Sequence, residues 1–548
     1  MLDALIAVLL GLAALIAATG GVEVQVGAVT LRSHSVWRVL AVAVIPVLIR
    51  ARQLVAAPDA AAAWLTRMAL TTLMVLGVGY WFKYLLTSVG GSDSFGYASA
   101  ARLLASGRLI DPAPVAEWLS APNRLALATP LGWQPSAGGL GIVPAYPLGL
   151  PGLMALFTMA GGPDAIYFVS PVMGLLTLWL VFRLARMWAD DTTALLATVL
   201  VTWNPVFLTY AKQPMSDVLA TAWTLAAVCL ALMRTGPLSA AGAGVAAGAA
   251  FLTRPATILA GAVVPLLALR GPTPWRRLVI AGIGVATAGL VQVSIQWHFF
   301  GNPLGTGYGT ADALFTWPAL PQNLDIYARQ SWVALGGPWL VGLATGMWVM
   351  RGPRTNAVVA VATAVTLPYL FYIRFDHWET LRFLLPGIVP LSILVAAGAV
   401  RLAAGVRAPI LSSLFVILFA GAFVTRSERL MRESNVFDIQ NIEARYALAG
   451  QWVTVNTPLT SVILADQHSG SLRWYSGRQT VRWDLLDAGA LVQTVSDLEG
   501  HGATVYVALE GSEIQRFDAK FAPELSRLSV DPVGRIHNVS FLRLRLPR

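Results

Sequence analysis

Charged side chains and cysteines are scarce in this chain. Only 12% of its 548 residues are charged, whereas soluble domains carry about 25%. A soluble globular protein is therefore excluded, and the 56% hydrophobic content indicates a membrane protein. The single cysteine, Cys229, lies inside an apolar run and excludes an intrachain disulfide. Lysine occurs only at Lys83, Lys212 and Lys520, so the formal net charge of +10 comes mainly from arginine.

Long apolar runs recur from the N-terminus to about residue 424. Many approach the length of about 20 residues that crosses the hydrocarbon layer as a helix. The pattern predicts a mainly α, polytopic membrane helical bundle with about 13 transmembrane helices. The predicted spans are 3–19, 36–50, 65–88, 163–187, 191–208, 216–234, 238–252, 255–270, 277–299, 331–350, 356–373, 382–402 and 408–424.

Arginines beside the spans predict the orientation of the chain. They fall on alternate loops, at Arg50, Arg52, Arg67, Arg183, Arg186, Arg234, Arg270, Arg276, Arg277, Arg351, Arg354, Arg401 and Arg407. The positive-inside rule makes these loops cytoplasmic, and we therefore interpret the basic charge as topology and expect no nucleic-acid partner. We expect a multi-pass protein of the bacterial inner membrane with a cytoplasmic N-terminus. The alternative is a cleaved first span, for which Ala17-Ala18-Thr19 offers small residues but no basic region precedes them.

The composition changes after residue 424 and predicts two domains. Residues 1–424 form the transmembrane domain, with a long outer loop over 89–162, and residues 425–548 form a small α/β domain. An odd number of spans places this second domain in the periplasm. Its alternating and apolar segments predict four strands and two helices. The strands are 461–465, 479–483, 504–509 and 539–546, and the helices are 439–455 and 487–499. Residues 22–32 alternate like a small β-hairpin.

Two aspartates are predicted at the outer surface. Asp93 follows the third span, and Asp217 begins the sixth span after Pro214. Carboxylates are costly near hydrocarbon and tend to mark functional sites. Asp93 is suited to accept a proton from a substrate hydroxyl, and Asp217 is a second candidate acid. The alternative for each is a structural role as the N-cap of the helix that follows it.

Cations and aromatic residues lie on the same predicted face. Lys212 and Arg254 lie at outer span ends, where snorkelling toward headgroups is the alternative to a site role. The turn 374–382 contains His377, Glu379 and Arg382, for which a solvated turn is the alternative. Arginine binds phosphate through two parallel hydrogen bonds, so Arg254 and Arg382 are the better phosphate ligands.

Several motifs of soluble enzymes are missing. No spacing of His, Cys or Glu forms a zinc site from protein ligands alone. The glycine-rich segment 301–309 lacks the Lys-Ser/Thr ending of a nucleotide-binding loop, although Tyr308 within it is a candidate substrate contact. There is no Gly-x-Ser-x-Gly element of a serine hydrolase.

The order of the motifs over about residues 60–400 resembles the GT-C superfamily of membrane glycosyltransferases. The likeness is greatest to its bacterial branch of protein mannosyltransferases and lipid A aminoarabinose transferases. The segments that carry it are Asp93 with Tyr97, Leu103–Gly107, Tyr210–Asp217, Leu252–Pro255, Gly301–Leu304 and Arg382–Pro386. Asp93 is followed by Ser94, where the family commonly has an Asp-Glu pair, and this makes Asp217 the candidate second acid.

The resemblance implies transfer of a sugar from a polyprenyl-phosphate donor to a hydroxyl of a lipid, glycan or protein. Asp93 would deprotonate the acceptor, which attacks the anomeric carbon with inversion. Arg254, Lys212 or Arg382 would stabilise the departing phosphate. Tyr97, Tyr308, His377 and Glu379 would contact substrate, and an apolar groove would hold the prenyl chain. A divalent metal, Mg²⁺ or Mn²⁺, bridging Asp93, Asp217 and the phosphate is the alternative.

Two other classes of protein also fit a chain with many spans. A transporter or flippase for lipid-linked saccharides would have interrupted helices and polar residues near the middle of the bilayer, often in symmetric halves. A non-catalytic scaffold would present the C-terminal domain and would need no clustered outer carboxylates. The gathering of charge at one surface, without an internal repeat, favours the enzyme.

Overall fold

The computed structural model describes residues 2–26, 29–54, 58–233, 236–269, 273–406 and 408–547. Arg234, Arg270 and Arg407 of the predicted cytoplasmic loops lie outside the described residues. The chain forms two compact units. The first comprises residues 1–85, 170–289 and 315–437, and the second comprises 86–169, 290–314 and 438–548.

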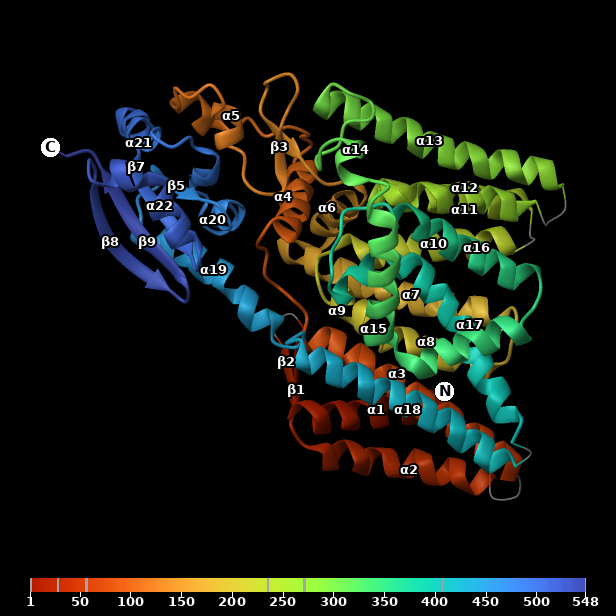
Figure 1. Ribbon diagram of the computed structural model, residues 1–548. Coiled ribbons are helices and arrows are strands. Elements are labelled where there is room, and N and C mark those ends of the chain that lie inside the picture. Colours follow the sequence, from red (N-terminus) through yellow and green to blue (C-terminus); the bar gives the residue numbers. More distant parts are fainter. Residues whose placement is uncertain are drawn as a thin grey trace. The chain divides into compact units, whose positions relative to one another are not determined.

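Four apolar helices of the first unit run side by side (Figure 1). Helix α1 packs against α2 and α3, and α3 also packs against α18. The strands β1 (Val22–Val26) and β2 (Val29–Ser33) pair as an antiparallel hairpin, as predicted. The four helices are α1 (Leu2–Thr19), α2 (Val36–Leu54), α3 (Pro58–Lys83) and α18 (Pro409–Glu433).

Helix α17 belongs to the most buried of the long apolar helical stretches in the described ranges, and it packs against α8, α10, α15, α16 and α18. Glycines bring α15 and α17 into direct backbone contact, since a Cβ on Gly398 would lie 2.1 Å from the Gly342 carbonyl oxygen. Small residues at such positions let membrane helices approach closely. The remaining helices of the first unit, of which α7 begins and α13 ends in the second unit, are α7 (Val169–Arg186), α8 (Asp191–Thr202), α9 (Pro205–Ala211), α10 (Ser216–Leu232), α11 (Pro237–Thr253), α12 (Ile258–Ala268), α13 (Pro274–Phe300), α15 (Ala319–Val349), α16 (Pro353–Tyr369) and α17 (Leu385–Ala404).

Within the described residues, seven helices are long and apolar enough to cross a membrane. The number is eight if α8 and α9, which meet at a bend of 66°, form one span. Asn204 causes this break, because its side chain accepts hydrogen bonds from the backbone N–H groups of Val206 and Phe207. Pro205 then begins the new helix. The protein is a multi-pass membrane protein, but this count does not confirm the predicted 13 spans.

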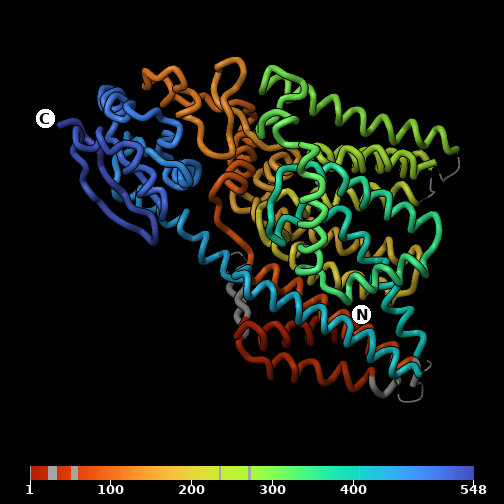
Figure 2. The backbone as a smooth tube through the Cα atoms, in the orientation of Figure 1, coloured from red at the N-terminus to blue at the C-terminus, as the bar shows by residue number. Residues whose placement is uncertain are grey.

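The second unit is assembled from three separate parts of the chain, which Figure 2 shows in orange, green and blue. The first part contains α4 (Asp93–Ala105), α5 (Arg124–Leu127), β3 (Trp133–Pro135), β4 (Ile142–Pro144) and α6 (Gly149–Gly161). It is tied to the C-terminal part by hydrogen bonds. Arg482 N–H donates to the Leu127 carbonyl at 2.7 Å, and the Ser120 hydroxyl donates to Asp497 at 2.6 Å.

The C-terminal part contains a mixed five-stranded sheet in the order β6-β5-β7-β9-β8. Strand β5 is parallel to β6 and β7, whereas β9 is antiparallel to β7 and β8. This bears out the predicted α/β character of the C-terminal region. The strands are β5 (Ser461–Ala465), β6 (Gln479–Val481), β7 (Thr504–Glu510), β8 (Ser529–Ile536) and β9 (Val539–Arg545). The helices are α19 (Ile439–Asn456), α20 (Ser469–Ser476), α21 (Leu491–Gly500) and α22 (Glu513–Leu525).

Candidate active site

Asp93 is the first residue of α4, and a tyrosine holds its carboxylate. The Tyr146 hydroxyl lies 2.7 Å from Asp93 Oδ1, to which it donates, and 2.6 Å from the Ser92 hydroxyl. Ser92 occupies the N-cap position and makes no capping hydrogen bond with its side chain. Burial, together with the Asp93 carboxylate, raises the pKa of Tyr146. The Tyr146 hydroxyl therefore keeps its proton and remains a donor to Asp93.

Three tyrosine rings meet beside this carboxylate. The Tyr146 ring lies 4.7 Å from that of Tyr97 and 5.6 Å from that of Tyr308, measured between centroids. Tyr97 is buried, whereas Tyr308 is 47% exposed. Gly96 allows this packing, because a Cβ there would lie 2.4 Å from Tyr146. The structure thus brings together Asp93, Tyr97 and Tyr308, all predicted from sequence, around Tyr146, which was not.

A second cluster, in the first unit, joins three other predicted residues. Asp217 is 1% exposed, and its Oδ1 lies 2.8 Å from a terminal nitrogen of Arg254. The other terminal nitrogen of Arg254 lies 3.5 Å from the Arg382 backbone carbonyl. The Arg382 guanidinium lies over the ring of Tyr210 at 5.3 Å, and both guanidinium groups lie 5.2 Å from the Phe383 ring. Two arginines and one buried carboxylate thus form a group with a net positive charge.

The other predicted site residues of this unit differ in exposure. Lys212 is fully buried, and its ammonium group donates to the Val436 carbonyl, so it ties the α9–α10 turn to the end of the unit. His377 and Glu379 lie at the start of the 3₁₀ helix Trp378–Leu384. The His377 side chain is 59% exposed, and its Nδ1 lies 3.9 Å from Glu379 Oε2.

No group of three or more His, Cys, Asp or Glu side chains arranged to hold a metal occurs among the described residues. Both carboxylates proposed as metal ligands have other partners. Asp93 accepts from Tyr146, and Asp217 pairs with Arg254. A positively charged guanidinium in contact with Asp217 disfavours a cation there. The donor set therefore does not fit a metal site made from protein ligands.

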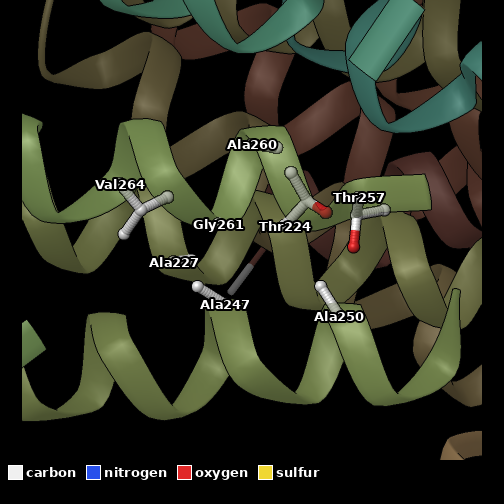
Figure 3. A pocket seen from close by; sticks show the side chains of 8 residues that line it. All are labelled: Thr224, Ala227, Ala247, Ala250, Thr257, Ala260, Gly261 and Val264. Atoms are coloured by element: carbon white, nitrogen blue, oxygen red, sulfur yellow. The ribbon is translucent and has the colours of Figure 1, made fainter. Parts of the chain in front are cut away.

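A small cavity lies among α10, α11 and α12 (Figure 3). Its volume is about 10 Å³, which is roughly the room that one water molecule needs. It is too small for a prenyl chain, so it is not the apolar groove expected for a lipid donor. Its lining consists mostly of small side chains: Thr224, Ala227, Ala247, Ala250, Thr257, Ala260, Gly261 and Val264.

Solved structures share the fold at low sequence identity. ArnT from Cupriavidus metallidurans bound to undecaprenyl phosphate is 15% identical, with a TM-score of 0.56 over 86% of this chain and 97% of that one. The arabinofuranosyltransferase AftD from Mycobacteria is 15% identical, with a TM-score of 0.53 over 86% and 41% of the two chains. The Archaeoglobus fulgidus oligosaccharyltransferase is 12% identical, with a TM-score of 0.50 over 80% and 69%. No curated protein sequence matches the chain.

A family assignment rests on the sequence itself. Residues 133–469 match the Alg9-like mannosyltransferase family, and this range is more than half of the 548-residue chain. The match includes Tyr146, Asp217, Arg254 and Arg382, together with Tyr308, but begins after Asp93. The GT-C resemblance found in the motifs is thereby confirmed, and the chain belongs to the Alg9-like mannosyltransferase family of GT-C membrane glycosyltransferases.

Proposed function

We propose that the protein transfers a sugar from a polyprenyl-phosphate donor to an acceptor hydroxyl, with inversion at the anomeric carbon. The acceptor is a lipid, a glycan or a protein at the periplasmic face of the bacterial inner membrane. Membership of a mannosyltransferase family favours mannose as the sugar. The undecaprenyl phosphate bound to ArnT supports a polyprenyl carrier. The observation that carries the proposal is the Asp93 carboxylate, which the Tyr146 hydroxyl holds at 2.7 Å.

Asp93 acts as the general base in this proposal. It takes the proton of the acceptor hydroxyl while the acceptor oxygen forms a bond to the anomeric carbon. The bond between that carbon and the phosphate oxygen breaks, and the electron pair leaves with the phosphate. Tyr146 fixes the direction of the carboxylate, the buried Tyr97 ring supports the Tyr146 ring, and the exposed Tyr308 ring offers an apolar face against which a sugar packs.

Arg254 and Arg382 stabilise the departing phosphate. Fixed cations placed where negative charge develops lower the barrier without reorganising in the reaction. Asp217 contributes by orienting Arg254 through their buried ion pair. Removing one partner of such a pair leaves the other charge uncompensated, so the two residues act together. Lys212 adds positive charge to the same unit, and His377 and Glu379 contact the substrate from the exposed turn.

A divalent metal between Asp93 and Asp217 is the alternative source of positive charge. Because the arginines already supply that charge and each aspartate has a partner of its own, we expect no metal requirement. Transfer after treatment with EDTA and gel filtration is expected to stay at the untreated rate. A loss that Mg²⁺ or Mn²⁺ restores would favour the metal instead.

The finer topology is part of the same proposal. We retain about 13 crossings, a cytoplasmic N-terminus and a periplasmic C-terminal domain with its boundary near residue 425, on the pattern of apolar runs and flanking arginines. In this count α2, α10, α11, α16 and the short helix Pro255–Thr257 with α12 also cross the membrane. The outer loop 89–162 then places Asp93 on the periplasmic side.

The test is sugar transfer in proteoliposomes from a panel of radiolabelled polyprenyl-phosphate sugars, beginning with mannose. Extracted lipids, glycans and proteins serve as acceptors. The full chain is compared with Asp93→Asn, which keeps the size and the hydrogen-bond acceptor beside Tyr146 but removes the base. We expect transfer by the wild type and a loss of at least about 100-fold in the variant.

The control for folding is the size-exclusion profile of each protein in detergent. Equal transfer by a well-folded Asp93→Asn variant would remove Asp93 as the base and turn attention to Asp217. Movement of a lipid-linked sugar across the bilayer without transfer would instead support a flippase.

A further inference from the structure

The segment 89–95, which carries Asp93, packs against the C-terminal part of its own unit. Strand β5 is followed by Asp466, Gln467 and His468, and strand β7 ends at Glu510. In open α/β sheets, ligands bind at this carboxyl edge of the parallel strands. Here Gly90 lies against the ring of Tyr446, since a Cβ on Gly90 would lie 1.9 Å from that ring. Gln467, just after β5, lies near the same segment, since a Cβ on Gly91 would lie 3.5 Å from its Nε2.

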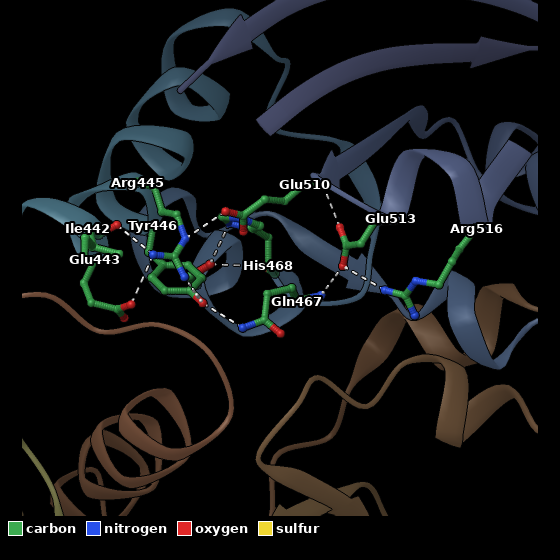
Figure 4. A network of polar contacts seen from close by, with 10 residues as sticks. Ile442, Glu443, Arg445, Tyr446, Gln467, His468, Glu510, Glu513 and Arg516 are labelled. Carbon is green, nitrogen blue, oxygen red and sulfur yellow. Dashed lines mark hydrogen bonds and ion pairs between the residues drawn. The ribbon is translucent and has the colours of Figure 1, made fainter. Parts of the chain in front are cut away.

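A network of partly buried polar groups holds Tyr446 in place (Figure 4). The Gln467 amide nitrogen donates to the Tyr446 hydroxyl at 2.7 Å, and the Arg445 guanidinium donates to it at 3.1 Å. Glu510 joins two members of the network, because its carboxylate lies 3.0 Å from Arg445 Nε and 2.9 Å from His468 Nε2. The His468 ring in turn packs 4.9 Å from the Tyr446 ring. The tyrosine is thus fixed at both its ring and its hydroxyl.

Two contacts from α20 hold the same segment at its ends. The Tyr475 hydroxyl accepts a hydrogen bond from the Val89 backbone N–H at 2.7 Å. At the other end, Phe95 lies against Gly470, where a Cβ would come within 2.2 Å of the Phe95 ring. Asp93 lies between these two contacts. Gly91, inside the segment, has a φ of +58°, a conformation that glycine adopts readily, and the Ser94 hydroxyl donates to the Gly90 carbonyl, so these outer contacts add to the segment's own hydrogen bonds.

We propose that Tyr446 and Tyr475 are positioning residues that hold the segment 89–95 so that Asp93 meets the acceptor hydroxyl. This rests on the proposed role of Asp93 as the base. A misplacement of about 1 Å between reacting groups lowers a rate by roughly 100-fold. Anchoring contacts around Asp93 therefore bear on the deprotonation of the acceptor hydroxyl, whereas the arginines of the first unit act on the departing phosphate.

The experiment compares Tyr475→Phe and Tyr446→Phe with wild type. Each change removes one hydroxyl and keeps the ring that packs. Tyr506→Phe in β7 is the matched control, since Tyr506 lies in the hydrophobic core of the sheet. For Tyr475→Phe we expect kcat to fall by about tenfold, because Val89 N–H loses its acceptor, while KM for the donor stays unchanged. The kcat of Tyr446→Phe is also expected to fall, and Tyr506→Phe is expected to have the kcat and KM of the wild type.

Hydrogen exchange of residues 89–95 gives a second readout that needs no activity. We expect faster exchange there in Tyr475→Phe, with unchanged exchange in β7. Unchanged exchange in the segment would overturn the proposal, as would wild-type kcat in both variants when Asp93→Asn is inactive. If Asp93→Asn stays active, the base assignment fails, and the hydrogen exchange alone decides whether the two tyrosines hold the segment.

Discussion

At the scale of single residues, the candidate base depends on a partner that lies 53 positions away in the sequence. Tyr146 is buried in the second unit and donates to Asp93 Oδ1 at 2.7 Å. Hydrogen bonds to a charged group are stronger than those between neutral groups. Because the buried Tyr146 ring is itself held by packing, its hydroxyl fixes one direction of the carboxylate.

Replacing Tyr146 by phenylalanine tests this contact. We expect kcat to fall by about tenfold with the donor KM unchanged, because the ring still packs and only the hydrogen bond is lost. Burial and the neighbouring carboxylate raise the pKa of Tyr146, so the wild-type hydroxyl stays protonated at alkaline pH. The ratio of wild-type to variant rates is therefore expected to stay constant from about pH 7 to 10.

The control for this measurement is Tyr506→Phe, which removes a hydroxyl elsewhere in the same unit. A ratio that falls toward one as the pH rises would mean that Tyr146 loses its proton in that range. This would contradict the donor role assigned to it.

The residues of the site were predictable where they carry charge beside an apolar run. Asp93, Asp217, Arg254 and Arg382 are conspicuous for that reason, and the structure joins the last three in one cluster. Tyr146 was missed because it lies in an irregular loop and has no charge to distinguish it. Its role depends on the close approach of Gly96, which no local pattern in the sequence reveals.

At the scale of elements, regular strands were predictable and irregular ones were not. The predicted strands 461–465 and 504–509 agree closely with β5 and β7. Strand β8 was missed because Pro532 and Gly534 weaken its strand pattern, and the sheet accommodates them at an edge with a register shift. The break between α8 and α9 was also missed, since the apolar run continues through Asn204.

Helix α15 contains a second break, which supports a prediction about stability. Gly336 has φ 81° and ψ 164°, a conformation essentially restricted to glycine. Arg426 of α18 donates to the carbonyls of Trp332 and Val333, both at 2.8 Å, and so satisfies groups just before the break. A Cβ on Gly336 would lie 2.5 Å from Arg426 Nε.

We therefore expect Gly336→Ala to lower the free energy of unfolding by about 1–3 kcal/mol. The measurement is the thermal unfolding midpoint in detergent. Gly421→Ala in α18 is the control, because no atom lies within 4 Å of its added Cβ and alanine favours a helix. A Gly336→Ala midpoint equal to that of the control would show that the break tolerates a side chain.

At the scale of the whole molecule, composition was sufficient to identify a membrane protein, but the contacts between distant segments were hidden. The Val89–Tyr475 hydrogen bond joins residues 386 positions apart. The second unit contains residues from three parts of the chain, so most of the loop 89–162 and the C-terminal region belong to one compact body. Periodicity reports only local structure, and it carries no information about which loop a sheet edge will meet.

The orientation of the chain depends on whether α16 crosses the membrane. Four candidate spans lie between residues 276 and 459: α13, α15, the helical stretch that ends with α17, and α18. Helix α16 lies among them but has only 17 residues. At 1.5 Å per residue this helix is about 26 Å long, close to the thickness of a thin bilayer. If α16 crosses, the five crossings place residues 276 and 459 on opposite sides. If it does not, the four crossings place them on the same side.

Two introduced cysteines distinguish these cases. Cys229 is buried, so an impermeant maleimide is expected to leave the wild-type chain unlabelled. Leu459 is 85% exposed and Arg276 is also exposed, so each position tolerates a reactive thiol. In spheroplasts we expect labelling of Leu459→Cys at once and of Arg276→Cys only after the membrane is permeabilised. Immediate labelling of both would require an even number of crossings between them and would place the loop at Arg276 outside, against the positive-inside rule.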